Sequence, residues 1–346
     1  MMMSERTKMT GSPKQKFTNL PLDHFEGLTN FDKATDKTVT TSSKRQTKQK
    51  SGATFEENMA KIKERSELAL NKSRVAIEER VLQQSFPEWN EDKRAVPNPF
   101  VRSGLFSVKN SKDDERKFLD KLVLPSLSNY RIEFTGKELQ QDDLSVWLFL
   151  INCAKKQPIA DSVYFTGYQI VTDLGWSINS KSYTRAKRSI ERLKVTGLEV
   201  SSVNSDTGQK EQAYGGSLIR EYSWDAVDGE KNIKWMVRFE PKISLLFLED
   251  TTTLASWEIR KAIGSRHTVA QWLHYYFESH TTPFPISIKK LHELCRSDDS
   301  VSSFRSSIKR ALDKLIEVEF LSSYVIENDL VKVVQNKRPR LKVSKK

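Results

Sequence analysis

One stretch of the chain, residues 165–198, restricts the possible folds more than any other. It reads FTGYQIVTDLGWSINSKSYTRAKRSIERLKVTGL, with a short apolar face up to Leu174 followed at once by Gly175, a typical helix stop. After a polar turn, apolar residues recur at steps of three and four, and basic residues recur at the same steps on another face. We therefore predict two helices joined by a tight turn, with basic side chains on the exposed face of the second helix.

This pattern is typical of a helix-turn-helix, whose second helix enters the major groove of DNA. A basic face on an amphipathic helix is also the ordinary form of a solvated surface. Taken alone, the stretch leaves both interpretations open. The two faces of the second helix are an apolar face of Tyr183, Ala186, Ile190 and Leu193, and a basic face of Lys181, Arg185, Arg188 and Arg192.

The pattern occurs a second time, in residues 284–324. They read FPISIKKLHELCRSDDSVSSFRSSIKRALDKLIEVEFLSSY, again a short apolar helix, a polar turn and a longer helix with basic residues one turn apart. The apolar face of the longer helix consists of Phe304, Ile308, Leu312 and Leu315. Because two such units in one chain are hard to attribute to solvation alone, we predict that both bind DNA.

The candidate DNA contacts are basic side chains that can reach phosphates or base edges, and hydroxyls near the helix starts that can reach phosphates. In the first unit they are Lys181, Ser182, Tyr183, Thr184, Arg185, Lys187 and Arg188. In the second unit they are Ser302, Ser303, Arg305, Lys309 and Arg310. The chain ends in KRPRLKVSKK, whose Lys337, Arg338 and Arg340 can lie along phosphates or in a minor groove, although many basic tails bind nothing specific.

Strand patterns surround the first unit. Residues 130–135 alternate like a strand, and a helix that Asp142 or Asp143 can cap follows them. A short strand at residues 163–165 leads into the unit. Three strands are expected after the unit, forming its sheet hairpin, at residues 198–203, 217–224 and 233–239.

The second unit is followed by a hairpin of residues 320–326 and 330–334. A helix-turn-helix followed by a hairpin is a winged helix. We therefore predict an α+β fold of two tandem winged-helix domains, preceded by a largely disordered N-terminal arm. The expected boundaries are an arm and partner-binding linker at residues 1–115, domain 1 at 116–252, domain 2 at 253–336 and a basic tail at 337–346.

The segment before the first domain is expected to change character along its length. Residues 1–52 have too little apolar surface to offset the entropy of ordering, whereas residues 53–82 suggest one or two exposed helices. The linker that follows is rich in proline and aromatic residues, which favours an extended peptide that docks in a groove of another protein. The alternative is that Trp89, Phe100 and Phe106 only attach the linker to the first domain.

Composition restricts the partners and the compartment. A formal net charge of +12 favours nucleic acid over a membrane surface. The two cysteines, Cys153 and Cys295, belong to no CxxC pair and are interpreted as buried thiols of a reducing cytosol. No apolar run is long enough to span a bilayer, and the N-terminus lacks the core of a signal peptide, so we expect a soluble cytoplasmic protein.

Enzyme activity is the competing class of function. A nucleotide-driven motor needs a phosphate loop of the form GxxxxGK[ST], which the sequence lacks. A nuclease needs carboxylates or histidines clustered around a metal, and the histidines His24, His267, His274, His280 and His292 are dispersed. We therefore expect a protein that performs no covalent chemistry and needs neither a metal nor a cofactor.

Several stretches resemble one protein family, the TrfA-type plasmid replication initiators of the iteron-binding Rep group. The resemblance lies in RAVPNPFVRSGLF (94–106), FTGKELQQDDLSVW (134–147), DLGWSINSKSYTRAKRSIERL (173–193), WEIRKAIGS (257–265) and YYFESHTTPFPI (275–286). It covers roughly residues 94–334. The resemblance implies two tandem winged-helix domains in a bacterial protein that binds direct repeats, or iterons, at a plasmid origin.

The resemblance also implies partners. Members of this family open an adjacent AT-rich duplex, with release of single-stranded DNA, and recruit the host helicase together with the host initiator DnaA. It implies a monomer–dimer equilibrium in which dimers are inactive and limit copy number. The sheet of the first domain is a candidate interface for such a dimer. A winged-helix transcription regulator or autorepressor is the alternative, because winged helices serve both purposes.

The family's glutamine-led motif for the sliding clamp ends in Leu-Phe, and this chain departs from it. The corresponding stretch reads LQQSF, in which Gln83, Gln84 and Phe86 match and Ser85 stands in place of the leucine. We therefore expect clamp binding to be weak or lost.

Overall fold

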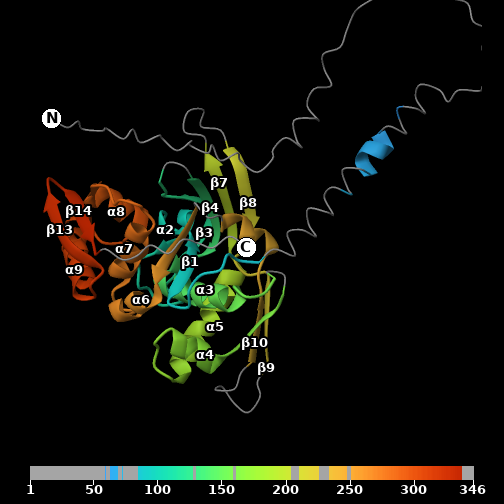
Figure 1. Ribbon diagram of the computed structural model, residues 1–346, viewed down its shortest axis with the longest axis horizontal. Helices are drawn as coiled ribbons and strands as arrows, with labels where there is room; N and C mark the ends of the chain where they lie inside the picture. Colours follow the sequence, from blue (N-terminus) through green and yellow to red (C-terminus); the bar gives the residue numbers. More distant parts are fainter. Residues whose placement is uncertain are drawn as a thin grey trace, which may run out of the picture. The chain divides into compact units, whose positions relative to one another are not determined.

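The computed structural model describes residues 59, 63–68, 72, 85–127, 130–158, 161–203, 210–225, 234–247 and 251–336 (Figure 1). By their contacts the residues form two units, Met1–Glu64 and Arg65–Lys346. The helices and strands labelled in Figure 1 all belong to the second unit, which is a mixed α/β structure. The predicted disordered arm lies outside the described residues, and residues 63–68 are helical and exposed.

The first predicted unit lies within a module that we call module 1, residues 141–238. It consists of α3 (Gln141–Ala154), β6 (Val163–Thr166), α4 (Gly167–Asp173), α5 (Ser180–Lys194), β9 (Glu221–Asp225) and β10 (Lys234–Arg238). The three strands form an antiparallel sheet in the order β6-β10-β9. The predicted stop after α4 is confirmed, because Gly175 adopts the left-handed conformation with φ of 66°.

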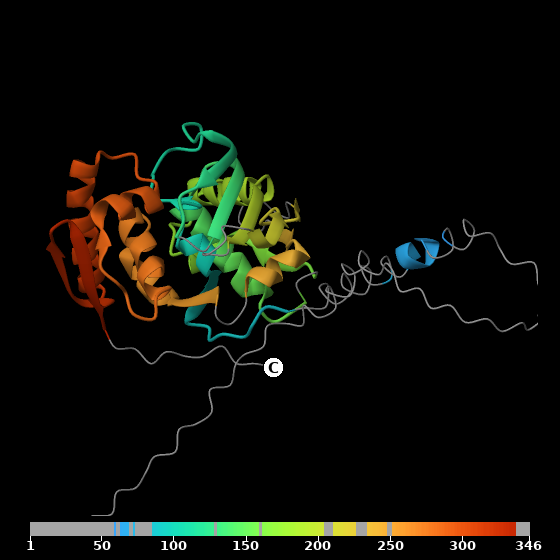
Figure 2. The ribbon, with the colours of Figure 1, turned by 90° about the horizontal axis from the view of Figure 1, so that it is seen from above.

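Module 2, residues 268–335, repeats this order of elements. It consists of α7 (Thr268–Glu278), β12 (Ile286–Ser287), α8 (Ile288–Cys295), α9 (Val301–Glu317), β13 (Leu321–Glu327) and β14 (Leu330–Gln335). Its strands pair in the order β12-β14-β13, the same as in module 1. The predicted hairpin is confirmed, and its turn is formed by Asn328 and Asp329, both with positive φ. Figures 1 and 2 show module 2, in orange and red, beside module 1.

The hairpin of module 1 differs from the prediction. Strand β7 (Gly197–Val203) does not join β9 and β10 but pairs with β4 (Tyr130–Lys137) and β8 (Lys210–Gly216). Together with β3 (Phe118–Leu124) they form a separate sheet, β3-β4-β7-β8. The prediction of three consecutive strands in one hairpin was therefore wrong. The β7–β8 hairpin is an insertion between α5 and β9, and its buried Leu198 and Val200 pair with the buried residues of β4.

The segment ahead of module 1 belongs to the folded core, so the predicted start of the folded part at residue 116 is too late. Strand β1 (Lys93–Pro97) pairs with β11 (Thr252–Ser256), which follows module 1 in the sequence. The short helix α2 (Asn98–Val101) and β2 (Phe106–Ser107) come next, and β2 pairs with β5 (Leu139–Gln140). Trp89, Phe100 and Phe106 are buried, which supports the alternative that they attach the linker to the first domain.

The two modules are joined by buried polar contacts as well as by packing. Arg260 in α6 (Trp257–Ile263), between the two modules, is fully buried. It donates hydrogen bonds of 2.9 Å to the Gln141 carbonyl and the Ser145 hydroxyl in α3 of module 1, and one of 3.4 Å to the Gln271 carbonyl in α7 of module 2. Arg296, just after α8 in module 2, forms an ion pair of 2.5 Å with the buried Glu138, which lies just ahead of module 1. Because a buried arginine is stable only with its acceptors in place, these contacts fix one module against the other.

Candidate nucleic-acid interface

Helix α5 is the long cationic helix of module 1. It begins where the Asn179 side chain accepts a hydrogen bond of 2.9 Å from the Ser182 backbone N–H, a normal N-cap. Ala186, Ile190 and Leu193 of its predicted apolar face are buried. The opposite side of the helix borders a groove of about 880 Å³.

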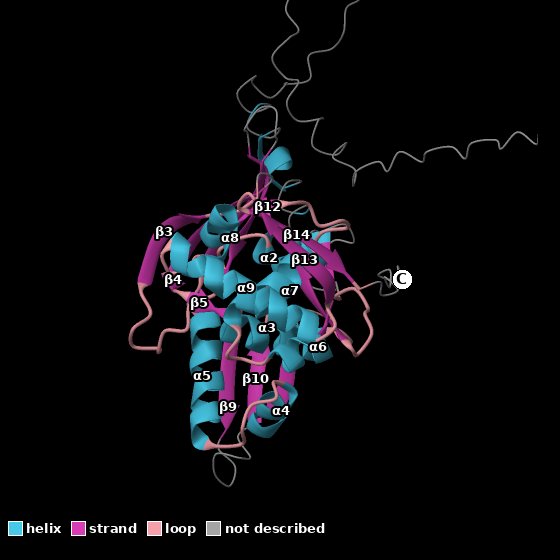
Figure 3. Ribbon diagram, turned by 90° about the vertical axis from the view of Figure 1, so that its left-hand side faces the viewer, coloured by secondary structure: helices cyan, strands magenta, loops and turns pink. Residues whose placement is uncertain are grey.

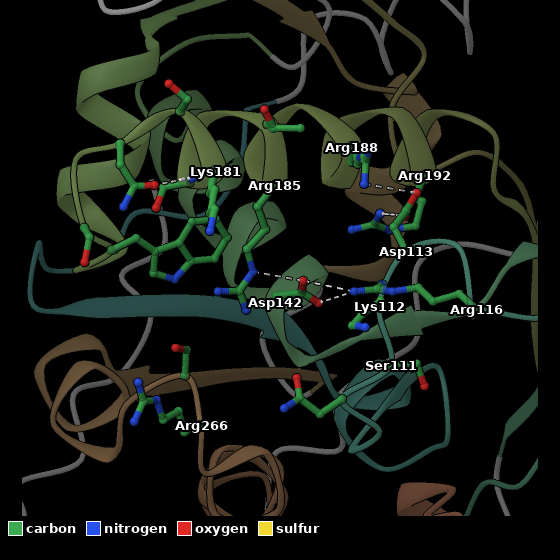
Figure 4. Close-up of a pocket in the computed structure, with 18 of the residues that line it drawn as sticks. Ser111, Lys112, Asp113, Arg116, Asp142, Lys181, Arg185, Arg188, Arg192 and Arg266 are labelled. Atoms are coloured by element: carbon green, nitrogen blue, oxygen red, sulfur yellow. Dashed lines mark hydrogen bonds and ion pairs between the residues drawn. The ribbon is translucent and has the colours of Figure 1, made fainter.

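The groove lies between α5, the loop at residues 110–116, and a loop of residues 264–267 that precedes α7. Figure 4 shows Lys181, Arg185 and Arg188 on one wall and Arg266 on the opposite wall. Its basic lining residues are Lys112, Arg116, Lys181, Arg185, Arg188, Arg192 and Arg266, and its acidic ones are Asp113, Asp114 and Asp142. Cations outnumber carboxylates in this lining, so the groove favours an anionic ligand.

Arg185 is held in place by two neighbours. Its Nε atom lies 3.3 Å from Asp142 Oδ2, and its guanidinium lies over the Trp176 ring, 4.2 Å from the centroid. The ion pair offsets part of the charge, and the ring restricts the side chain to one direction. Arg185 therefore has a fixed orientation in the groove, with its remaining N–H groups available to an acceptor.

Arg192 was predicted to be part of the exposed basic face, and this prediction was wrong. Its side chain is 5% exposed and its Nη2 atom lies 2.7 Å from Asp143 Oδ1. Asp143 also accepts hydrogen bonds from Arg116 at 2.5 Å and from the Gln140 backbone N–H at 2.8 Å. The buried cluster of Arg116, Asp143 and Arg192 therefore ties α5 to the start of α3, where Asp143 completes the capping box of α3.

The ionisation of the two adjacent carboxyls reflects this cluster. Burial raises the pKa of Asp142, but Arg116 and Arg185 outweigh it and hold that pKa below its ordinary value. Burial and the neighbouring charge of Asp142 raise the pKa of Asp143 above its ordinary value. Arg116 and Arg192 act in the opposite direction by attracting the Asp143 carboxylate.

The other predicted contacts of α5 differ in their exposure. Lys181, Thr184 and Arg188 are exposed, and Ser182 is half-buried. Lys187 lies on a different side of the helix, with its Nζ atom 4.7 Å from the centroid of the Trp224 ring in β9. The hydroxyl of Tyr183 is buried, and Tyr183 packs against the core. The prediction that Tyr183 contacts phosphates through its hydroxyl was therefore wrong.

Helix α9 presents its predicted residues to solvent. Ser302, Ser303, Arg305, Lys309 and Arg310 are all exposed. The N-cap is Ser300, whose Oγ atom accepts a hydrogen bond of 3.2 Å from the Ser303 backbone N–H. Arg305 Nη2 lies 2.5 Å from Asp329 Oδ1 in the β13–β14 turn, so the helix and the hairpin tip are joined at the surface.

The predicted clamp motif and basic tail are placed differently. Gln83, Gln84, Lys337, Arg338 and Arg340 lie outside the described residues. Phe86 is buried, with its ring in edge contact with Phe239 and Phe247. A clamp anchor must be exposed, so the assignment of Phe86 as a clamp contact does not fit this structure.

Sequence reasoning missed several groove residues. Trp176 orients Arg185, Asp113 lies 4.0 Å from Arg188, and Arg266 comes from the loop just ahead of module 2. The tryptophan in the turn after α4 was the one signal present, whereas nothing in the local sequence marked Arg266.

In the described part of the chain, no three His, Cys, Asp or Glu side chains are grouped to hold a metal ion. None of the helices described there is long and apolar enough to cross a membrane.

These features define a mixed α/β protein with two modules of the same topology, each presenting a long cationic helix. The TrfA protein family matches residues 47–335, and the chain belongs to this family. The plasmid replication initiator protein TrfA of Escherichia coli is 30% identical over 246 residues, or 70% of this chain. The matched part spans 62% of that relative's length.

Two further proteins are similar to the chain. RepFIB replication protein A of Escherichia coli is 25% identical over 270 residues, which cover 73% of this chain and 82% of the relative. The crystal structure of domains 2 and 3 of RctB covers 70% of this chain and 99% of its own, with 17% sequence identity and a TM-score of 0.49.

Proposed function

We propose that this protein initiates plasmid DNA replication by binding direct repeats at the plasmid origin. The observation that carries the proposal is the repeated module: α5 and α9 occupy the same place in two modules of equal topology, and both present basic side chains. Membership of the TrfA family and the names of the relatives support replication as the process.

Each module is interpreted as a winged helix. In this interpretation α4 and α5, and likewise α8 and α9, form the helix-turn-helix, while the β9–β10 and β13–β14 hairpins are the wings. A recognition helix contacts base edges with residues near its N-terminus. Lys181 and Thr184 of α5, and Ser302 and Arg305 of α9, lie in the first turns of their helices and are exposed.

The mechanism in this proposal uses binding energy and no covalent chemistry. One chain reads two successive major grooves of a repeat through its two recognition helices. Several chains on adjacent repeats bend the DNA and favour opening of an AT-rich segment, and the basic surfaces then hold single-stranded DNA. Recruitment of the host helicase, with the host initiator DnaA, follows in the bacterial cytoplasm on the plasmid itself.

Oligomeric state regulates this activity in the proposal. Monomers bind the repeats, and dimers are the inactive form. Isolated dimers that bind repeats as tightly as monomers do would contradict this part of the proposal.

A plasmid maintenance assay tests the proposed function. A plasmid that carries the origin repeats is introduced into bacteria that supply the full-length protein from a second replicon. We expect maintenance with the wild-type protein and with Lys242→Ala, an exposed charge outside the groove, and loss with the double variant Lys309→Ala and Arg310→Ala. If the protein represses its own promoter but never maintains the plasmid, it is a transcription regulator.

A further inference from the structure

Arg266 lies between the two cationic helices. Besides lining the groove beside α5, it lines a second groove of about 560 Å³ beside α9. The charged side chains that α9 contributes to this second groove are Arg310, Asp313, Lys314 and Glu317. Arg266 is therefore the residue at which the surfaces around the two helices meet. Figure 3 shows α5 and α9 in one view of the molecule.

The loop that carries Arg266 is fixed at both ends. It begins at Gly264, which ends α6 with a φ of 81°, a conformation that suits glycine. On one side it is anchored by the buried Arg260 of α6, and on the other by Thr268, whose hydroxyl donates a hydrogen bond of 2.6 Å to the Val108 carbonyl. The loop therefore holds a defined position while its arginine side chain extends into solvent.

The Arg266 side chain is exposed and has no ion pair among the residues that the structure describes. In this respect Arg266 differs from three other arginines, each of which forms an ion pair with a carboxylate: Arg185, Arg192 and Arg305. An unpaired guanidinium at a cationic groove is free to bind an external acceptor. In the proposed function, the hydrogen-bond acceptors that reach Arg266 are those of DNA.

The geometry of DNA determines which part of the duplex reaches Arg266. If α5 and α9 enter two successive major grooves, the minor groove between them faces the surface between the two helices. A·T-rich DNA has a narrow minor groove with enhanced negative potential, which attracts arginine side chains. The exocyclic amino group of guanine occupies the minor groove of G·C pairs and is absent from A·T pairs.

We propose that Arg266 enters the minor groove in the middle of each repeat and selects A·T pairs there. The inference rests on the proposed function and deepens it, because it adds a specificity determinant outside both recognition helices. It assigns to the loop at residues 264–267 a preference at base pairs whose minor groove, and not their major groove, faces the protein.

Base analogues test this proposal with full-length protein. Hypoxanthine paired with cytosine presents a major groove close to that of G·C but lacks the minor-groove amino group. A duplex with one repeat is prepared in three forms, with A·T, hypoxanthine·C or G·C pairs in its middle, and the dissociation constants are measured. For the wild-type protein we expect the G·C form to bind about tenfold more weakly than the other two.

Variants then assign the effect to Arg266. We expect Arg266→Ala to bind all three duplexes with equal affinity, Arg266→Lys to retain a smaller preference, and Lys242→Ala to retain the full preference. Arg266→Ala with an undiminished preference, or a hypoxanthine·C form that binds as weakly as G·C, would overturn the inference.

The binding measurements distinguish a failure of this inference from a failure of the proposed function. If the repeat is bound more tightly than scrambled DNA but its middle pairs have no effect, only the role of Arg266 is wrong. If the repeat and scrambled DNA are bound equally, both proposals fail.

Discussion

Arg192 Nη2 lies 2.7 Å from Asp143 Oδ1, at a point where both side chains are buried. Because of this ion pair, one residue of the predicted basic face of α5 lies in the protein interior. It joins the cationic helix α5 to α3. Helix α3 in turn accepts hydrogen bonds from Arg260 of α6, which also donates to the Gln271 carbonyl in module 2. The orientation of α5 is therefore linked to the contact between the modules.

Replacement of Arg192 tests this structural role. Arg192→Ala leaves Asp143 buried with only part of its hydrogen bonding, so we expect the free energy of unfolding to fall by about 3–5 kcal/mol. Arg188→Ala is the matched control because its side chain is 54% exposed, and it should change stability by less than about 1 kcal/mol. Urea unfolding measures both values. Equal stability of the two variants would refute the buried role of Arg192.

Replacement of Phe86 distinguishes a core residue from a clamp anchor. Phe86 packs among aromatic rings, so Phe86→Ala should lower the free energy of unfolding by about 3–5 kcal/mol. The neighbouring Ser85 is exposed, and Ser85→Ala should leave stability unchanged. A Phe86→Ala protein that unfolds like the wild type but loses binding to the sliding clamp would show that Phe86 is an external anchor.

Acid should weaken the attachment of the linker to α3. Hydrogen bonds from Lys155 and Lys156 lower the pKa of Glu91 to about 2. A carboxyl whose pKa is lower in the folded state contributes stability above its ordinary pKa of about 4.5, and that contribution is lost as the pH falls from there to about 2. Because Glu91 is largely exposed, the effect should be below about 1 kcal/mol.

The Glu91→Gln variant isolates this effect. The difference in unfolding free energy between wild type and variant should be largest above pH 5 and should shrink towards pH 2. A difference that stays constant over this range would mean that the ion pairs of Glu91 do not contribute.

Arg305 should determine one base position of the repeat. Arg305→Ala should weaken binding to the repeat by about 1–3 kcal/mol. When the base pair that Arg305 reads is altered, the variant and the wild type should bind the repeat with the same affinity. Asp329→Asn serves as a control for the surface ion pair, because asparagine removes the charge and tolerates the positive φ of this turn position. Its effect on stability should be below about 1 kcal/mol because both side chains are exposed. Competition binding with a set of singly altered repeats measures the loss. An equal loss on random DNA would indicate a phosphate contact only.

Local sequence patterns predicted the elements that local interactions determine. The spacing of apolar residues identified α5 and α9, Gly175 marked the end of α4, and the polar residues at 327–329 marked the β13–β14 turn. Such local patterns did not predict which strands, distant in the sequence, pair with one another. The alternation in β7 predicts a strand, but its partner β4 lies far earlier in the sequence, and the choice of partner depends on which sheet edge is open.

The candidate site was predictable to a similar extent. Helical spacing placed Lys181, Arg188 and Lys309 on exposed surfaces, where the structure has them. It also placed Arg192 there, because the carboxylate that pairs with it belongs to α3 and leaves no trace in the sequence of α5. Arg266 was missed for the same reason, since its position between two helices arises only when the modules are assembled.

The most direct test of the account is equilibrium binding of the full-length protein to the origin repeats and to scrambled DNA of equal length, at two salt concentrations. Non-specific binding through phosphates weakens steeply with salt, because each neutralised phosphate releases condensed counterions. We expect the scrambled DNA to be released at the higher salt concentration while the repeats stay bound. If the affinities for both DNAs fall together, α5 and α9 are only electrostatic surfaces, and the account of two recognition helices is contradicted.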